Sequence, residues 1–276
     1  MIEPRSWLFV PADSERKIAK ALESQADAII FDLEDSVAPG QKLKARDALK
    51  GLPKRSGGPQ WWVRINPIGS EFHKDDLHLI GLADVHGIVL PKAESGADIT
   101  RLAHRTGNIP IHAIVTETAA SLFGLLSYRD PKSPLCAMSW GAEDLSAALG
   151  ASSKFDASGE LGFTYKLARS LCLAGAVAAG VQPVDGVFSD FRDEEGLREE
   201  AEAARREGFT GKLAIHPGQV DVINAAFTPS KDDVIHAQEI VAAFEAQPDA
   251  GVLSVGGKMV DRPHLVQARR VLERAR

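Results

Sequence analysis

The sequence predicts an α/β protein, a (β/α)8 TIM barrel with a C-terminal helical extension. Eight short runs, each apolar on both faces of a strand, alternate with charged segments of helical spacing, which is typical of a parallel sheet covered by helices. Closing eight such units takes about 250 residues, and the chain has 276. The competing open, doubly wound sheet would hold a dinucleotide on a glycine-rich turn, but the sequence contains no GxGxxG or GxxxxGK[ST] motif.

The elements follow in order along the chain. The predicted strands cover residues 7–10, 28–32, 61–65, 87–90, 111–115, 136–140, 184–188 and 213–215. Amphipathic spacing predicts helices over 14–25, 41–52, 96–106, 167–179 and 194–207. After the eighth strand, two further helices over 232–246 and 263–276 are joined by a glycine-rich turn at 251–257. We therefore divide the chain into a catalytic barrel, residues 1–228, and a C-terminal extension, residues 229–276.

Composition narrows the class of protein. Lys and Arg total 32 against 38 Asp and Glu, a net charge of −6, so no overall positive field attracts nucleic acid. No secretion signal and no apolar run of about 18 residues is found, so we expect no membrane span and a cytoplasmic location. Cys136 and Cys172 lie in apolar surroundings without metal-like spacing, and we interpret both as packing residues.

Polar side chains follow six of the predicted strands. These segments are 32–35 (DLED), 64–67 (RINP), 91–92 (PK), 116–118 (TET), 141–144 (GAED) and 216–217 (HP). Because the active site of such a barrel lies at the carboxyl ends of its strands, we expect these carboxylates, cations and amides to meet in one site.

The acidic residues after strands five and six indicate a metal. Glu117, Glu143 and Asp144 supply only oxygen ligands, which suits magnesium or manganese rather than zinc. Two carboxylates plus substrate oxygens would complete an octahedron. The alternative for Asp144 is a helix N-cap for residues 145–149.

Arg64 offers a planar fork for a carboxylate or a developing enolate oxygen. The alternative role for Arg64 is that of a partner in a buried ion pair. We expect part of the acidic run 32–35 to hold Arg64 or Lys92 in place rather than to contact the metal. Lys92 could instead form a Schiff base if burial lowered its pKa, but Glu94 and the neighbouring acids oppose that lowering. His216 fits a base or ligand contact as well as a structural hydrogen bond at a strand end.

Taken together, these stretches resemble the citrate lyase beta-subunit-like branch of the HpcH/HpaI aldolase family. The matching pieces are RSWLFVPA at 5–12, FDLEDSV at 31–37, VRIN at 63–66, LPK at 90–92, ET at 117–118, GAED at 141–144, IHP at 215–217 and GKMVD at 257–261. The family often has Gly where Ala12 stands here.

The resemblance implies a magnesium-dependent lyase that breaks or forms a carbon–carbon bond in a short 3-hydroxyacyl thioester, assembled as a homotrimer or a dimer of trimers. Within that range we expect citramalyl-CoA or malyl-CoA to be cleaved to acetyl-CoA and a 2-oxo acid. The alternatives are a citrate lyase beta subunit acting on a carrier-protein thioester and a Schiff-base aldolase using Lys92.

The resemblance also implies roles for single residues. Glu117 and Asp144 are the metal ligands, and Arg64 contacts the acyl oxygen or carboxylate. Asp261 is an acid or base supplied from a neighbouring subunit, although by itself it fits a helix N-cap before Arg262 and Pro263.

The remaining site predictions are less specific. We expect catalytic roles for Glu34 and Asp35, and substrate contacts from Glu117, Lys92, Ala142 and Glu143. Cofactor contacts are expected from His216 and from Arg16 and Lys17, with Lys20 one turn on, where coenzyme phosphates could bind. The alternative for this basic cluster is a solvated helix face.

Overall fold

The computed structural model describes residues 3–54, 57–130 and 132–275. The chain forms two compact units, Met1–Asn224 and Ala225–Arg276, and each is described by itself. The division falls near the predicted end of the barrel at residue 228.

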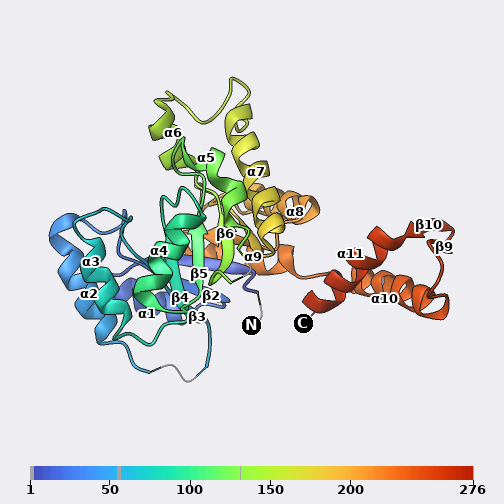
Figure 1. Ribbon diagram of the computed structural model, residues 1–276, viewed down its shortest axis with the longest axis horizontal. Helices are drawn as coiled ribbons and strands as arrows, with labels where there is room; N and C mark the ends of the chain where they lie inside the picture. The colour runs from blue at the N-terminus through green and yellow to red at the C-terminus, as the bar shows by residue number, and fades with distance from the viewer. Residues whose placement is uncertain (1–2, 55–56, 131, 276) are drawn as a thin grey trace. The chain divides into compact units, whose positions relative to one another are not determined.

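The first unit is a closed barrel of eight parallel strands in the order β1 to β8 (Figure 1). The strands are β1 (Ser6–Pro11), β2 (Ala28–Asp32), β3 (Gln60–Arg64), β4 (Gly87–Leu90), β5 (Ile111–Ile114), β6 (Leu135–Ser139), β7 (Gln182–Asp185) and β8 (Gly211–Ala214). β8 pairs with β1 from Ser6↔Lys212 to Leu8↔Ala214, which closes the ring. All eight predicted strands and the barrel are confirmed, with the largest shift at β7, predicted at 184–188.

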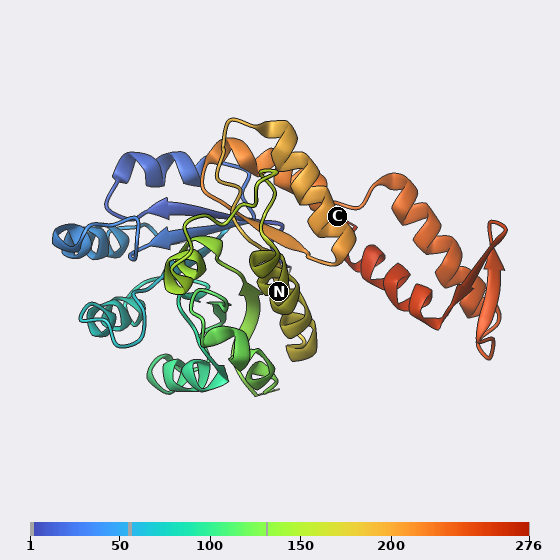
Figure 2. The same ribbon diagram turned by 90° about the horizontal axis from the view of Figure 1, so that it is seen from above.

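Helices lie outside the barrel (Figure 2). They are α1 (Glu15–Leu22), η1 (Pro39–Gln41), α2 (Lys42–Lys50), α3 (His73–Ile80), α4 (Gly96–Thr106), α5 (Ser121–Gly124), η2 (Leu125–Tyr128), α6 (Ala142–Leu149), α7 (Phe163–Ala179), α8 (Glu194–Glu207), η3 (Pro217–Gln219) and α9 (Val220–Phe227). The five predicted helices are confirmed. The sequence explains where α4 begins and ends. Ser95 and Asp98 form a capping box at its start, Ile99 and Leu102 are its buried residues, and Gly107 ends the helix at φ 70°.

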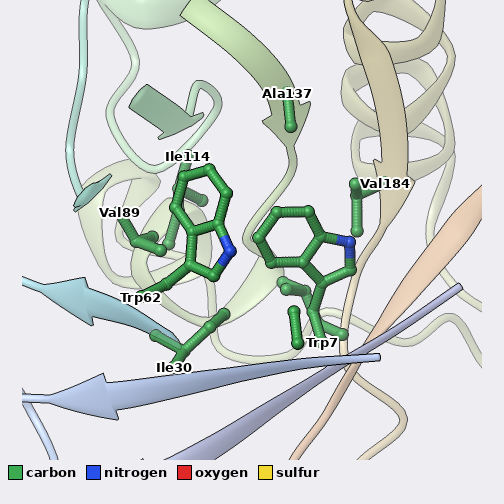
Figure 3. Close-up of a cluster of buried hydrophobic side chains, with 9 residues drawn as sticks. Trp7, Ile30, Trp62, Val89, Ile114, Ala137 and Val184 are labelled. Atoms are coloured by element: carbon green, nitrogen blue, oxygen red, sulfur yellow. The ribbon is translucent and has the colours of Figure 1, made fainter. Parts of the chain in front are cut away.

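Side chains fill the barrel (Figure 3). The interior cluster is Trp7, Ala28, Ile30, Trp62, Val89, Ile114, Ala137, Val184 and Leu213. The rings of Trp7 and Trp62 lie 4.9 Å apart between centroids. Their size requires a glycine beside them, since a Cβ at Gly87 would lie 2.2 Å from the Trp62 ring. The barrel is therefore a packed core, and its site must lie above that core.

The second unit consists of α10 (Lys231–Ala246), β9 (Val252–Val255), β10 (Lys258–Asp261) and α11 (Arg262–Arg274). The two predicted helices are confirmed, but the prediction of a simple turn for the glycine-rich segment 251–257 is wrong. It forms an antiparallel hairpin, β9 with β10, turned by Gly256 and Gly257 at φ 56° and 77°, which suits a tight two-residue turn. Phe244, Val255, Val260 and Leu265 belong to this unit's own apolar cluster.

Among the described residues, no helix combines the length and the apolar character that crossing a membrane requires.

Candidate active site

A cavity of about 400 Å³ lies at the carboxyl ends of the barrel strands. Its lining comes from the ends of β1, β2, β3, β5, β6, β7 and β8 or from the segments that follow them: Phe9, Pro11, Asp32, Asp35, Ser36, Arg64, Ile114, Glu117, Trp140, Gly141, Ala142, Glu143, Asp144, Val187, Leu213 and Ile215. The predicted meeting of strand-end residues is thus seen for β2, β3, β5 and β6. Lys92, which follows β4, contacts four of these strand-end residues: Glu34, Asp35, Glu117 and Asp144.

Two carboxylates hold Arg64 in place. Asp32 accepts hydrogen bonds from Arg64 Nε at 2.7 Å and Nη2 at 2.6 Å, and Glu34 Oε2 lies 3.0 Å from Nη1. Burial acts to raise the pKa of Asp32, but the Arg64 guanidinium and the hydrogen bonds from Ser36 and the Glu34 backbone together outweigh burial and hold this pKa below its ordinary value. Arg64 is therefore both a buried ion-pair partner and a wall of the cavity, so its two interpretations are compatible.

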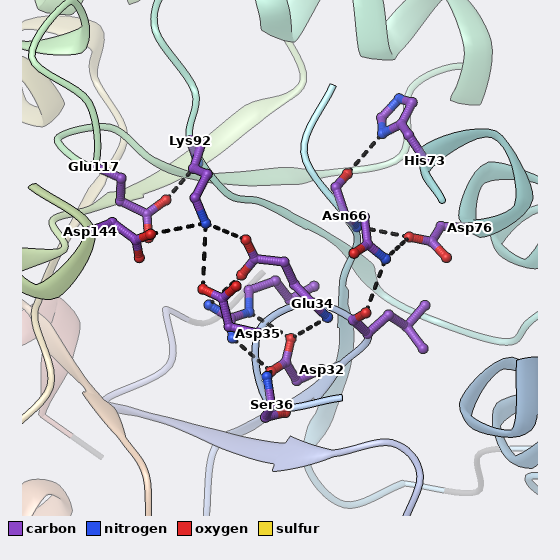
Figure 4. A network of polar contacts seen from close by, with 12 residues as sticks. Asp32, Glu34, Asp35, Ser36, Asn66, His73, Asp76, Lys92, Glu117 and Asp144 are labelled. Carbon is purple, nitrogen blue, oxygen red and sulfur yellow. Dashed lines mark hydrogen bonds and ion pairs between the residues drawn. The ribbon is translucent and has the colours of Figure 1, made fainter. Parts of the chain in front are cut away.

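Lys92 has an unusual backbone and several carboxylate partners (Figure 4). Its φ is 52°, in the left-handed region. The Nζ atom lies 2.5 Å from Glu34 Oε1, 3.1 Å from Asp144 Oδ1 and 3.4 Å from Asp35 Oδ2. Burial acts to lower the pKa of Lys92, but Glu34, Glu117 and Asp144 together outweigh burial and raise this pKa above its ordinary value. The amine is protonated at neutral pH, which disfavours the Schiff-base alternative because a protonated amine is not a nucleophile.

Glu117 is a buried carboxylate with little compensating charge. Burial, reinforced by Asp144 and Glu34, raises its pKa to about 8, although the Lys92 backbone N–H and Arg64 act to lower it. That N–H donates to Glu117 Oε2 at 2.5 Å. A Cβ at Gly141 would lie 2.9 Å from Glu117 Cγ, so the glycine makes room for this side chain.

Asp144 lies in the first turn of α6, where Gly141 is the N-cap and no side chain caps the helix. The alternative interpretation of Asp144 as an N-cap is therefore wrong, because the helix begins earlier than residue 145. Its carboxylate instead contacts Lys92 and shares the cavity with Glu117.

These two carboxylates fit a magnesium ion. No group of three or more His, Cys, Asp or Glu side chains in the described ranges is arranged to hold a metal, but magnesium in proteins is commonly held by one or two carboxylates, with substrate and water oxygens as further ligands. Glu117 is buried and lacks a full counter-charge. A divalent cation at this point would supply that charge.

The other predicted site residues are placed as follows. Ala142 and Glu143 line the cavity, and Glu143 also pairs with Lys154. His216 caps η3, its Nδ1 accepting from the Gly218 N–H at 3.1 Å, and it stacks on Phe191. The structural hydrogen bond predicted for His216 is thus confirmed, and the residue is not among those lining the cavity.

Two further predictions concern residues outside the cavity lining. Arg16 and Lys17 are exposed on α1, as the solvated-face alternative predicts. Asp261 is the N-cap of α11, where it accepts the His264 N–H at 3.4 Å and lies 2.5 Å from His264 Nδ1. Its N-cap interpretation is confirmed, and its role at a neighbouring subunit's site stays a prediction.

Sequence reasoning missed a buried network beneath the acidic loop. Lys42 Nζ donates to the carbonyls of Leu33 and Glu34, both at 2.7 Å, and to Asn66 Oδ1 at 2.9 Å. Asn66 in turn donates to Asp76 Oδ2 at 2.7 Å. This network fixes the backbone that carries Glu34. The sequence did contain a sign that Lys42 is buried, since it lies on the same helix face as the apolar residues Ala45 and Leu49, which are buried.

A second missed network positions a cavity wall. Asp185, buried at the end of β7, accepts from Trp140 Nε1 and Arg169 Nε, both at 2.8 Å, and from Lys212 Nζ at 2.7 Å. Burial acts to raise the pKa of Asp185, but Lys212 and Arg169 outweigh it and lower this pKa to about 2. The ionised carboxylate therefore holds the Trp140 indole in place.

Comparison with known proteins is consistent with this geometry. Residues 5–217 match the model of the HpcH/HpaI aldolase/citrate lyase family. A (3S)-malyl-CoA thioesterase from Cereibacter sphaeroides is 38% identical over 275 residues, covering 98% of this chain and 94% of the relative. A citrate lyase subunit beta-like protein from Mycobacterium tuberculosis is 38% identical over 269 residues, with the same coverage. The crystal structure of protein CitE from M. tuberculosis in complex with magnesium, acetoacetate and coenzyme A is 37% identical, with a TM-score of 0.84 over 98% of this chain and 97% of that one.

Proposed function

The chain belongs to the HpcH/HpaI aldolase/citrate lyase family, and we propose that it is a magnesium-dependent carbon–carbon lyase for a short 3-hydroxyacyl-CoA. The substrate is of the citramalyl-CoA or malyl-CoA type, and the products are acetyl-CoA and a 2-oxo acid. The observation that carries the proposal is the meeting of Glu117, Asp144 and Arg64 at one cavity. The M. tuberculosis structure with magnesium and coenzyme A supports the same choice of cofactor and thioester.

The reaction needs a base for the 3-hydroxyl proton and positive charge near two oxygens. Loss of that proton forms the carbonyl of the 2-oxo acid as the bond between C2 and C3 breaks. The electron pair moves into the thioester enolate, which is then protonated at C2 to give acetyl-CoA. When bound, magnesium supplies Lewis-acid stabilisation of the hydroxyl and carboxylate oxygens.

Arg64 supplies the second positive centre. Its guanidinium has five N–H groups. Asp32 contacts Nε and Nη2, and Glu34 contacts Nη1, so each of the three nitrogens has one carboxylate contact. Two N–H groups remain to stabilise the enolate oxygen, and the ion pairs prevent the fork from rotating. Such preorganised donors contribute strongly to catalysis.

Glu117 and Asp144 hold the metal, and Glu34 and Asp35 position Lys92 and Arg64 rather than reacting themselves. Ala142 and Glu143 line the space for the acyl group, and Lys92, which contacts Asp144, is a further candidate for contact with the substrate. The base is Asp261 from a neighbouring copy, which requires an oligomer such as the homotrimer or the dimer of trimers that the resemblance implies. Arg16, Lys17 and His216 are our candidates for contacts to the coenzyme.

The direct test is an assay of the purified chain with citramalyl-, malyl- and 3-hydroxy-3-methylglutaryl-CoA, each in magnesium or in EDTA. Chromatography of the products should show acetyl-CoA released from at least one of them only in magnesium. Free coenzyme A without acetyl-CoA would show thioester hydrolysis, the activity named for the C. sphaeroides relative. Intact thioesters would instead favour a carrier-protein substrate, and trapping of Lys92 by borohydride would favour the Schiff base.

Variants of the metal ligands make the test specific. Glu117→Gln and Asp144→Asn should abolish acetyl-CoA release while the circular dichroism spectrum stays that of the wild type. Glu199→Gln is the matched control, because Glu199 is an exposed carboxylate on α8. Undiminished turnover in either ligand variant would overturn the proposal.

A further inference from the structure

Lys92 touches both proposed metal ligands through two different groups. Among the described residues it is the one non-glycine residue with positive φ, at 52°. This backbone directs its N–H to Glu117 Oε2, 2.5 Å away, while its side chain reaches Asp144 Oδ1 at 3.1 Å. A left-handed conformation is costly for a residue with a Cβ, and such strain is often found at functional sites.

The Lys92 ammonium and a bound magnesium ion, both positively charged, would compete for the same carboxylate. The ammonium lies against Asp144, an oxygen ligand that magnesium would share. Glu34 and Asp35 anchor the ammonium from the other side. Its charge therefore neutralises part of the negative charge that attracts a metal and also repels the metal directly.

We propose that Lys92 is a positioning residue that ties magnesium binding to substrate binding. Its ammonium weakens magnesium binding to the free enzyme, and an anionic substrate restores it. The proposal rests on the proposed function, since it assumes that Glu117 and Asp144 bind the metal. A 2-oxo acid carries a carboxylate and a carbonyl, so at this cavity it would add oxygen ligands and place negative charge beside Lys92 and Arg64. Linkage is reciprocal, so the metal also tightens binding of the acid.

The alternative is a purely structural role, in which Lys92 holds mutually repelling carboxylates together. The two roles predict opposite signs for the loss of the ammonium. If Lys92 only organises the site, its removal weakens metal binding. The backbone favours our proposal, because the N–H that fixes Glu117 belongs to the main chain and Asp144 is carried by α6. Neither anchor depends on the ammonium.

The test is a titration with Mn²⁺, followed by electron paramagnetic resonance, in the presence and absence of pyruvate. Lys92→Met should bind Mn²⁺ about tenfold more tightly than the wild type without pyruvate. Pyruvate should tighten Mn²⁺ binding about tenfold in the wild type and clearly less in the variant. Lys92→Arg keeps the charge and should follow the wild type. Lys44→Met, which removes an exposed lysine of α2, should not change Mn²⁺ binding.

Each other outcome has a defined meaning. Equal or weaker Mn²⁺ binding by Lys92→Met overturns the inference and leaves the lyase proposal standing. No Mn²⁺ binding by the wild type, with or without pyruvate, overturns both. If Lys92→Met does not fold, Lys92→Gly repeats the test, since glycine adopts the left-handed backbone without strain and keeps the N–H to Glu117.

Discussion

The shape of the Arg64 side chain matters for its proposed role as much as its charge does. A lysine keeps the charge but cannot form the bidentate pair with Asp32. Arg64→Lys should therefore lower kcat about 100-fold or more, as loss of an oriented oxyanion donor does, with a smaller change in KM. Steady-state release of acetyl-CoA measures this, and a kcat within a few-fold of the wild type would show that charge alone suffices.

The ring of His112 is buried inside the barrel and contacts Ser139 Oγ at 2.9 Å. Burial lowers its pKa to about 3, whereas an unfolded imidazole has a pKa of about 6.5. Between these values the unfolded chain binds a proton that the folded chain does not. Stability should therefore fall as pH decreases from 6.5 toward 3, by up to about 1.4 kcal/mol per pH unit from this group.

Urea unfolding between pH 7.5 and 5 measures this slope. His112→Gln has no group titrating there and should show a shallower dependence, since other contributions are shared by both proteins. Identical slopes in the two proteins would mean that His112 is not kept neutral by burial.

The sequence predicted some site residues better than others for a physical reason. Arg64, Lys92 and Glu117 come at or just after the ends of apolar strands, so chain order alone places them at one end of a barrel. Lys42 and Asp185 are fixed by partners far along the chain, Asn66 and Lys212 respectively. No local pattern shows which distant residue will neutralise a buried charge.

Strand β4 begins at a glycine that the barrel interior requires. A Cβ at Gly87 would meet the Trp62 ring at 2.2 Å and the Pro110 carbonyl oxygen at 2.6 Å. Gly87→Ala should cost about 1–3 kcal/mol or more of stability, because the neighbours include backbone and a closely packed ring. Gly40→Ala is the control, with nothing within 4 Å of its Cβ, and should change stability by less than about 0.5 kcal/mol. Equal midpoints of urea unfolding for both variants would contradict the packing argument.

Element limits were predictable where packing and capping agree, as in α4 and α8. They were not predictable in β9 and β10, where polar Ser254, Lys258 and Asp261 interrupt the apolar residues and only Val255 and Val260 are buried. The glycines between these strands were visible in the sequence, but the strands were not. The missed start of α7 has a similar cause, since Phe163 is exposed and does not extend the apolar pattern.

The barrel carries Glu117 and Asp144, which we propose as the metal ligands, and the second unit carries Asp261. If Asp261 acts at a neighbouring copy, Asp261→Ala and Glu117→Ala should each be inactive, while mixed oligomers of the two should regain activity. The mixture is made by joint refolding or co-expression and assayed for acetyl-CoA. Persistent inactivity, with mixed assembly verified by two affinity tags, would leave Asp261 as a helix cap only.

The placement of the tryptophans gives the molecule its own optical probes. The chain has four tryptophans, and Trp7 and Trp62 lie in contact within the barrel core, where their emission reports whether the barrel is intact. Trp140 instead lines the cavity and donates its indole N–H to Asp185. An occupant of the cavity changes the polarity around this one indole while the core pair stays the same. Fluorescence therefore follows ligand occupancy and unfolding as separate signals, and Trp140→Phe should remove only the first.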